Sequence, residues 1–213
     1  MTTRTPRTIT MWHGSRRWVG KPEIRKPAQG RAEHGPGIYT SNDYERALKY
    51  AQGGGVVRKV EFSPRLLLED AAIPLESAVG FVRKHLKGEK RETVIADLIR
   101  IQERRINSLS GKTFCGKGDH FIIAEVLRNL LVNNDTCIGK TGVALADYFV
   151  SHGIDAAISH IQRDEYWAVI FNPACILSTT PVRQSEIHFS EYMLPSPIEP
   201  EPRSKEADAG LSL

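Results

Sequence analysis

The sequence has few cysteines, no long apolar run and no internal repeat. Its 3 cysteines, Cys115, Cys137 and Cys175, are widely separated along 213 residues, so we expect a reducing compartment rather than a disulfide framework. No segment approaches the roughly 18 consecutive apolar residues that a membrane-spanning helix needs. The N-terminus is rich in Thr and Arg and lacks the apolar centre of a secretion signal. These absences favour a cytoplasmic protein with no membrane partner.

Two familiar ligand-binding motifs are incomplete. Cys115, His120 and Cys137 do not have the spacing of zinc-finger ligands, so no metal site is expected. Gly139-Lys140-Thr141 is similar to the end of a phosphate-binding P-loop, but the position that needs the first glycine of that motif is Asn134. A helix cap at Thr141 explains this segment adequately.

The chain divides into three parts by composition. Hydrophobic residues are 40% and charged residues 25% of the chain, a balance that fits one globular domain with a sizeable core. We assign this domain to residues 8–194, after a loose basic arm over 1–7. Residues 195–213 are rich in Pro and charge and poor in apolar side chains, which predicts a disordered tail.

Positive charge is concentrated at the N-terminal end. Residues 1–35 hold eight Lys or Arg against two Glu, a net +6, whereas the whole chain is +4. The segment from Trp18 to His34 is rich in Pro, Gly and charge and is expected to be a loop. A polyanionic partner such as RNA or DNA fits this distribution. A solubilising basic arm fits it equally well.

The stretch from Thr10 to Ala51 holds the most informative local pattern. Alternation at Ile9, Met11 and His13 predicts a short strand that ends on the histidine, followed by a turn at Gly14-Ser15. A second turn at Gly35-Pro36-Gly37 leads into a strand over Ile38-Tyr39-Thr40. Asn42 or Asp43 is then expected to cap a helix that runs to Ala51. This arrangement places Tyr39 at a strand-to-helix junction and Tyr50 three turns down the helix.

The rest of the domain alternates between helical and extended patterns. Apolar residues at helical spacing predict a helical insertion over about 75–108, interrupted at Gly88, whose charges we interpret as a solvated face rather than as a surface for target recognition. Asp119 is expected to cap a helix that carries Ile123 and Leu127, and a further helix is expected to stop at Gly153. The expected strands are 56–62, 154–159, 166–172 and one within 175–189.

Four short segments together resemble a known family. They are Trp12-His13-Gly14-Ser15-Arg16, Gly35-Pro36-Gly37-Ile38-Tyr39, Tyr50 at eleven residues after Tyr39, and Asp164-Glu165-Tyr166. In this order they resemble the NAD-binding core of the diphtheria-toxin-like and poly(ADP-ribose) polymerase-like ADP-ribosyltransferases, the His-Tyr-Glu type. The resemblance implies an α+β fold in which two small, mostly antiparallel sheets form an NAD cleft with inserted helices. It also implies an NAD-dependent transferase that needs no metal.

The resemblance implies a role for each matched residue on the NAD side. Cleavage of the nicotinamide–ribose bond passes through a transition state similar to an oxocarbenium ion, and Glu165 is the expected catalytic carboxylate that stabilises it. The rings of Tyr39 and Tyr50 would hold the nicotinamide between them. His13 would bind the ribose on the adenosine side, and the Gly14 backbone would meet the carboxamide.

Further residues are expected at the two ends of the site. Ser15 and Arg16 are candidates to reach the ribose and the pyrophosphate, and Gln162 and Asp164 are candidates to orient the acceptor. The basic N-terminal segment would then border the NAD site, so its charge has a third explanation, which is support for the pyrophosphate. The chain departs from the polymerase-like members at Ala47, where they carry a serine that bonds the carboxamide.

The expected activity is mono-ADP-ribosylation of a macromolecule, with nucleic acid favoured over protein as the acceptor. Small transferases of this resemblance are often bacterial or phage toxins, so by analogy alone a neutralising antitoxin protein is a candidate partner. Two alternatives stay open. One is a non-catalytic NAD, ADP-ribose or nucleic-acid binding module of the same fold, and the other is a tRNA 2′-phosphotransferase, which shares the fold and an early His-Gly element.

Overall fold

A computed structural model describes residues 7–16, 18, 20–28, 32–52, 54–104 and 120–198. The expected arm therefore lies outside the described residues except for Arg7, and so does the expected tail beyond 198. The end of the expected insertion at 105–108 and the expected helix cap at Asp119 are outside them as well.

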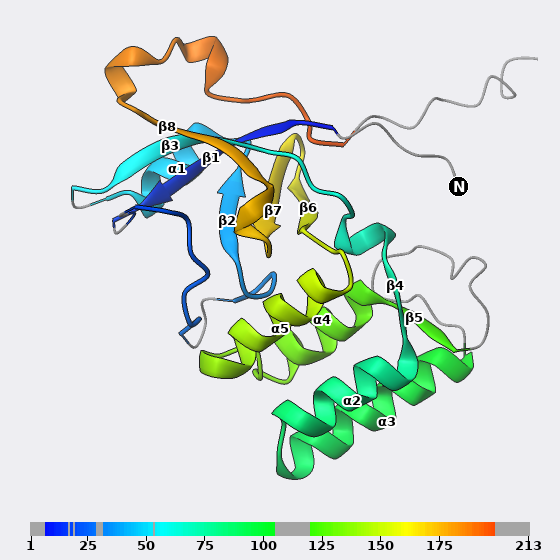
Figure 1. Cartoon of the computed structure of the whole chain (residues 1–213). Helices are drawn as coiled ribbons and strands as arrows, with labels where there is room; N and C mark the ends of the chain where they lie inside the picture. The colour runs from blue at the N-terminus through cyan, green and yellow to red at the C-terminus, as the bar shows by residue number, and fades with distance from the viewer. Residues whose placement is uncertain are drawn as a thin grey trace, which may run out of the picture.

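The main sheet has six antiparallel strands in the order β6-β7-β2-β1-β3-β8 (Figure 1). The strands are β1 (Ile9–Ser15), β2 (Ile38–Ser41), β3 (Val56–Phe62), β6 (Ala156–Gln162), β7 (Glu165–Ile170) and β8 (Ile176–Val182). A second, two-stranded sheet pairs β4 (Ala72–Pro74) with β5 (Phe121–Ile123). The predicted α+β class with antiparallel strands is confirmed.

The six strands fall into two halves that diverge between β1 and β2. Strands β1 and β3 pair over the full length from Ile9 to Ser15, whereas β1 and β2 share one registered pair, Trp12 with Ser41. In Figure 1, β2 and β7 run in a clearly different direction from β1 and β3. The two small sheets that we expected are therefore halves of one continuous sheet, because the pair of Trp12 with Ser41 still connects them. We call the sparsely paired boundary between β1 and β2 the seam.

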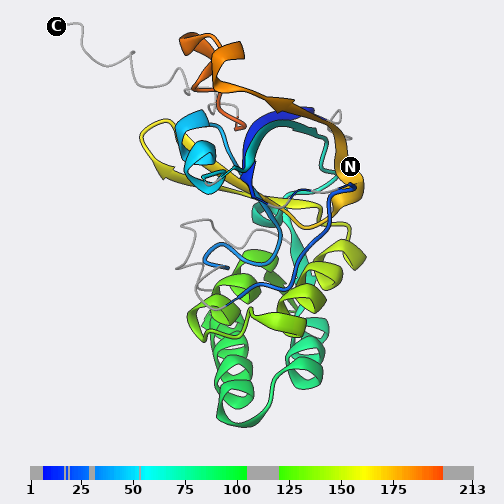
Figure 2. The same cartoon turned by 90° about the vertical axis from the view of Figure 1, so that its left-hand side faces the viewer.

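The helices outside the sheet form a separate layer beneath it (Figure 2). They are α2 (Leu75–His85), α3 (Gly88–Arg104), α4 (Ala124–Asn133) and α5 (Gly139–Ser151). Their shared core includes the fully buried Leu98, Leu127 and Phe149. Phe149 packs against Phe171, next to β7, with ring centroids 5.0 Å apart. The helical pattern predicted over 75–108 is confirmed as far as Arg104, and Gly88 begins α3 with φ of +61°.

Helix α1 (Tyr44–Tyr50) is different because it packs on the sheet and not with the helical layer. Its N-cap is Asp43, whose carboxylate accepts a hydrogen bond from the Glu45 N–H at 2.9 Å, as one of the two predicted caps required. Tyr44 packs against Trp12 with ring centroids 5.3 Å apart. Helix α1 is thus fixed to β1, directly beside the seam in the sheet.

Several predicted boundaries are wrong. Strand β1 does not end at His13, because Gly14 and Ser15 continue to pair with Val57 and Val56 of β3. Residues 121–123 form strand β5 and not the start of a helix, since they pair with β4 and α4 begins only at Ala124. Helix α5 begins at Gly139, two residues before the predicted cap at Thr141.

Candidate functional site

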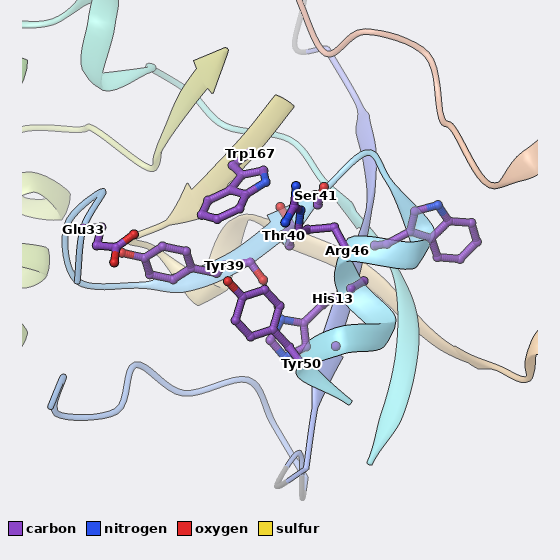
Figure 3. A pocket seen from close by; sticks show the side chains of 11 residues that line it. His13, Glu33, Tyr39, Thr40, Ser41, Arg46, Tyr50 and Trp167 are labelled. Atoms are coloured by element: carbon purple, nitrogen blue, oxygen red, sulfur yellow. The ribbon is translucent and has the colours of Figure 1, made fainter. Parts of the chain in front are cut away.

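A pocket of about 370 Å³ lies at the seam between β1 and β2 (Figure 3). Strands β1, β2 and β7, helix α1 and the loop before β2 all contribute to its wall. The lining residues are Trp12, His13, Gly14, Glu33, Tyr39, Thr40, Ser41, Arg46, Ala47, Tyr50 and Trp167. The pocket therefore forms beyond the single registered pair of β1 and β2, where the two strands no longer pair.

The His13 side chain links β1 to β2 where the two strands lack backbone pairing. Its Nδ1 lies 2.6 Å from the Tyr39 carbonyl oxygen, and because a carbonyl can only accept, Nδ1 carries the proton. Burial lowers the pKa of His13, opposed by this hydrogen bond and reinforced by the charges of Arg58 and Arg25. The ring is thus neutral at pH 7, and its Nε2 is left as an acceptor for a hydroxyl group.

Gly14 allows helix α1 to contact β1 directly. A Cβ atom at this position would lie 1.7 Å from the carbonyl oxygen of Ala47, a distance that no side chain could tolerate. Ala47 is itself buried and lines the pocket. Gly14 therefore has a packing role beyond the close approach to a ligand that the resemblance implies.

Tyr39 is held by its hydroxyl group, a role that the sequence did not indicate. The hydroxyl donates to the Gly35 carbonyl at 2.6 Å and accepts from the His34 N–H at 3.1 Å. Gly35 has φ of +97°, which favours glycine. These bonds fix the loop before β2, and burial raises the pKa of Tyr39 well above its usual range.

Tyr50 lines the pocket from a more exposed position than Tyr39. It is 54% exposed and is the last of the seven residues of α1. The prediction that Tyr50 lies three turns down the helix is wrong, because α1 begins only at Tyr44 and has about two turns. Tyr39 and Tyr50 nevertheless line the same pocket, as the resemblance requires.

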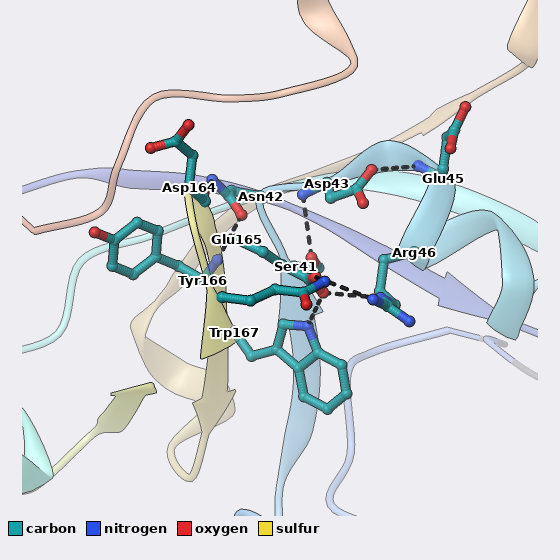
Figure 4. A network of polar contacts seen from close by, with 10 residues as sticks. Ser41, Asn42, Asp43, Glu45, Arg46, Asp164, Glu165, Tyr166 and Trp167 are labelled. Atoms are coloured by element: carbon teal, nitrogen blue, oxygen red, sulfur yellow. Dashed lines mark hydrogen bonds and ion pairs between the residues drawn. The ribbon is translucent and has the colours of Figure 1, made fainter. Parts of the chain in front are cut away.

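Glu165 is buried behind the pocket wall in a set of four hydrogen bonds (Figure 4). Arg46 donates from Nε to Oε1 at 2.8 Å and from Nη2 to Oε2 at 3.0 Å. The Trp167 indole donates to Oε1 at 2.7 Å, and Gln162 donates to Oε2 at 3.1 Å. The hydrogen bond from Arg46 is the main cause that lowers the pKa of Glu165.

Arg46 and Trp167 are site residues that the sequence did not identify. Both bond Glu165, and both line the pocket, whereas Glu165 is not among the lining residues. Trp167 lies two positions after Glu165 on β7, and the period of a strand places them on the same face. That spacing was a usable signal for Trp167, but nothing in the sequence marks Arg46.

The remaining predicted residues divide into those near Glu165 and those away from the pocket. Gln162 contacts Glu165 directly. The Asp164 side chain points away from Glu165 in Figure 4, and its carbonyl oxygen accepts from Asn42. Ser15 ends β1, and Arg16 is exposed next to it. Neither Ser15 nor Arg16 lines the pocket.

The basic loop after β1 extends from the sheet to the helical layer. Trp18 packs edge-on against His13 with ring centroids 4.8 Å apart, and the Arg58 guanidinium lies 5.5 Å from the Trp18 ring centroid. Further along, the Pro27 carbonyl accepts from the Gly139 N–H at 2.9 Å. Between these anchors, Lys21, Arg25 and Lys26 are exposed. Arg4, Arg17 and Arg31 lie outside the described residues.

The residues that the structure describes contain no candidate metal cluster and no helix that could span a membrane. Over that part of the chain, we find no group of three or more His, Cys, Asp or Glu side chains that could hold a metal ion. None of the helices described is long and apolar enough to cross a bilayer. Comparison with protein-family models, with curated proteins and with solved structures gives no match to this chain.

Proposed function

We propose that this protein transfers ADP-ribose from NAD to a macromolecule and releases nicotinamide. The observation that supports this most is convergence in space. His13, Tyr39 and Tyr50 line one pocket, and Glu165 lies immediately behind two residues of its wall. These are the residues of the His-Tyr-Glu resemblance, and they come from three strands and a helix.

The pocket offers suitable groups for the nicotinamide ring of NAD and for the ribose on its adenosine side. The Tyr39 and Tyr50 rings can contact a flat cationic pyridinium, which aromatic faces bind well. The neutral His13 ring presents Nε2 as an acceptor for a ribose hydroxyl. A volume of about 370 Å³ is within the usual range for a small-molecule site.

Glu165 is suited to stabilise positive charge on the ribose. When the bond between nicotinamide and C1′ breaks, the electron pair leaves with the nicotinamide and positive charge develops on the sugar. The acceptor then bonds C1′ and releases its proton to the solvent. Glu165 can oppose the developing charge only as a carboxylate, and its bonds from Arg46 keep it ionised.

We further propose a nucleic acid as the acceptor. Lys21, Arg25 and Lys26 are exposed on a loop that is anchored beside His13 by Trp18 and at α5 by Pro27. Exposed cations next to an aromatic pocket match a phosphate backbone that brings a nucleotide to the site. A protein acceptor is the next choice.

One observation favours a second candidate. Arg25 and Arg58 lie close enough to His13 to affect its pKa, and clustered basic side chains beside this histidine are what a tRNA 2′-phosphotransferase would need. The products separate the two functions. ADP-ribosylation adds label from NAD to the acceptor, whereas phosphotransfer removes a 2′-phosphate from RNA.

The test is incubation with adenylate-labelled NAD, followed by separation of protein and nucleic-acid fractions. The wild-type chain should release nicotinamide and label the nucleic-acid fraction. Glu165→Gln should bind NAD but transfer at least ~100-fold more slowly, the scale of one lost transition-state partner. Glu61→Gln is a matched control, because Glu61 lies on β3 and bonds Ser178. Near-normal transfer by Glu165→Gln would remove Glu165 from the mechanism.

A further inference from the structure

Asn42 connects three separate segments of the chain through one buried side chain. It is 1% exposed and lies between β2 and the cap of α1. Its Nδ2 donates to the Asp164 carbonyl at 2.8 Å and to the Leu194 carbonyl at 3.2 Å. Its Oδ1 accepts from the Tyr166 N–H at 2.8 Å. Both ends of the amide are thus used.

The partners of this amide flank the predicted catalytic residue. Asp164 and Tyr166 are the neighbours of Glu165, so Asn42 holds the peptide groups on both sides of it. The Asn42 N–H adds a bond to the Tyr166 carbonyl at 3.1 Å. Three hydrogen bonds from a single residue therefore fix the start of β7 (Figure 4).

The start of β7 needs this support because its pairing with β6 is irregular there. The register between β6 and β7 shifts between His160 and Gln162. Arg163, in the connecting turn, has φ of +44°, which is unusual for a residue other than glycine. The strand pairing with β6 alone therefore defines the direction of Glu165 poorly.

Asn42 also connects Glu165 to the helix that carries its ion-pair partner. It immediately precedes Asp43, the N-cap of α1, and Arg46 is in the first turn of that helix. The amide of Asn42 thus joins the backbone beside Glu165 to the backbone that positions Arg46. Leu194 completes the frame from the C-terminal segment, with its N–H bonded to the Asn42 carbonyl at 2.9 Å.

We propose that Asn42 is a positioning residue that aims the Glu165 carboxylate at Arg46 and Trp167, the two residues of the pocket wall that bond it. This inference rests on the proposed transferase function for its kinetic consequence but not for its structural one. Asn42 contacts neither the pocket nor the Glu165 carboxylate directly, and acts through backbone groups on either side.

The kinetic test compares Asn42→Ala and Asn42→Asp with Asn172→Ala. Asparagine 172 is a matched control, since its amide bonds Asp155 at 2.7 Å just beyond the other end of β7. Misplacement of a catalytic group by about 1 Å can cost ~100-fold in rate, so the Asn42 variants should lose ~10- to 100-fold in kcat, with KM for NAD changed less than about threefold. Asn172→Ala should lower Tm and keep kcat. If the Asn42 variants and Asn172→Ala lose the same amount of kcat for the same loss of Tm, the proposal is overturned.

A second measurement does not depend on activity. The chain has 3 tryptophans, and Trp167→Phe identifies the indole N–H resonance that reports the bond to Glu165. In both Asn42 variants this resonance should shift. The titration of Glu165 that the resonance reports should move to higher pH, because the carboxylate loses contact with Arg46. An unchanged resonance and titration would overturn the proposal. If the wild-type chain shows no NAD turnover, the transferase function fails, and this measurement still decides the role of Asn42.

Discussion

Arg46 and Glu165 are 119 positions apart in the sequence and form a two-bond ion pair at the back of the pocket, at 2.8 and 3.0 Å. The planar guanidinium matches the carboxylate, so the pair fixes a direction as well as a charge. Arg46 and Trp167 line the pocket and Glu165 does not, so a substrate in the pocket meets these two side chains before the carboxylate. The pair is therefore the part of the site that is most open to test.

Arg46→Lys should lower transfer activity more than it lowers NAD affinity, because lysine cannot make the two parallel bonds. It should also raise the pKa of Glu165, so that the acid limb of the kcat profile moves to higher pH. The measurement is kcat against pH for this variant and for Arg100→Lys, whose ion pair with Asp97 is exposed on α3. An acid limb that stays in place would show that Arg46 does not control Glu165.

The same ion pair predicts a stability change with pH. Since the pKa of Glu165 is lowered in the folded state from an ordinary value of 4.5, its contribution is present above pH 4.5 and is lost as the pH falls below it. Arg46→Gln should flatten the corresponding part of the stability curve. Urea denaturation between pH 3 and pH 6, about the range of this titration, measures it. Parallel curves for the two proteins would contradict this expectation.

Tyr39→Phe should be more harmful than the loss of a pocket hydroxyl alone. The change leaves the Gly35 carbonyl and the His34 N–H without their partner, which costs about 1–3 kcal/mol of stability when such groups are buried. Tyr39→Ala should add a rise in KM for NAD and a fall in kcat, because the ring is lost too. Thermal unfolding and steady-state kinetics separate the two effects. A Phe variant with wild-type Tm would show that the hydroxyl does not hold the loop.

Ala47→Ser should strengthen binding of nicotinamide and of inhibitors that mimic it. Ala47 lines the pocket at the position where the resembling polymerases carry a serine, and a hydroxyl there would offer one more hydrogen bond, worth about 0.5–1.5 kcal/mol. Titration of both proteins with 3-aminobenzamide measures the change. The half-buried Ala72 of β4 lies outside the pocket, and Ala72→Ser serves for comparison. Equal affinities in Ala47→Ser and wild type would place the carboxamide elsewhere.

Arg58→Gln should make His13 easier to protonate. The charge of Arg58 helps to lower the pKa of His13 below its ordinary value of 6.5, so its removal raises that pKa. The neutral ring is the form that donates only from Nδ1, and kcat/KM should therefore begin to fall at a higher pH than in the wild type. A histidine resonance followed by NMR from pH 5 to pH 8, about the range in which histidine titrates, gives the same answer without substrate. No movement in either measurement would contradict the assignment.

Neutralising the basic loop tests the acceptor. Replacement of Lys21, Arg25 and Lys26 by Gln should reduce labelling of nucleic acid much more than NAD hydrolysis, and should flatten its dependence on salt. Lys84, Lys87 and Lys90, which lie at the tip of the α2–α3 hairpin, supply a control of equal charge. Label found only on protein, or equal loss of both activities, would favour a protein acceptor.

The sequence predicted the elements of the site better than their connections. Helical and strand periodicity indicated the α2–α3 hairpin, strand β3 and the position of Tyr39, because each depends on burial of one local face. The end of β1 was placed too early, since Gly14-Ser15 usually marks a turn and only the pairing with β3 keeps it extended.

Arg46 and Asn42 could not be predicted in the same way. Each acts on β7 from more than a hundred residues away, and a polar residue in a short helix or at its cap gives no periodic signal. Asn42 was a candidate cap for α1, but Asp43 has that role and leaves the Asn42 amide for β7. Such contacts depend on how the two halves of the sheet meet.

The seam between β1 and β2 couples ligand binding in the pocket to the stability of the sheet. Past the pair of Trp12 with Ser41, the two strands are held together by the His13 side chain and not by further registered pairs in the described part of the chain. A ligand in the pocket contacts both strands at once and so links the two halves of the sheet. Ligand binding should then slow amide hydrogen exchange along the whole of β1 and β2, including residues far from the ligand. It should also make the two halves of the sheet unfold in a single step at a higher temperature.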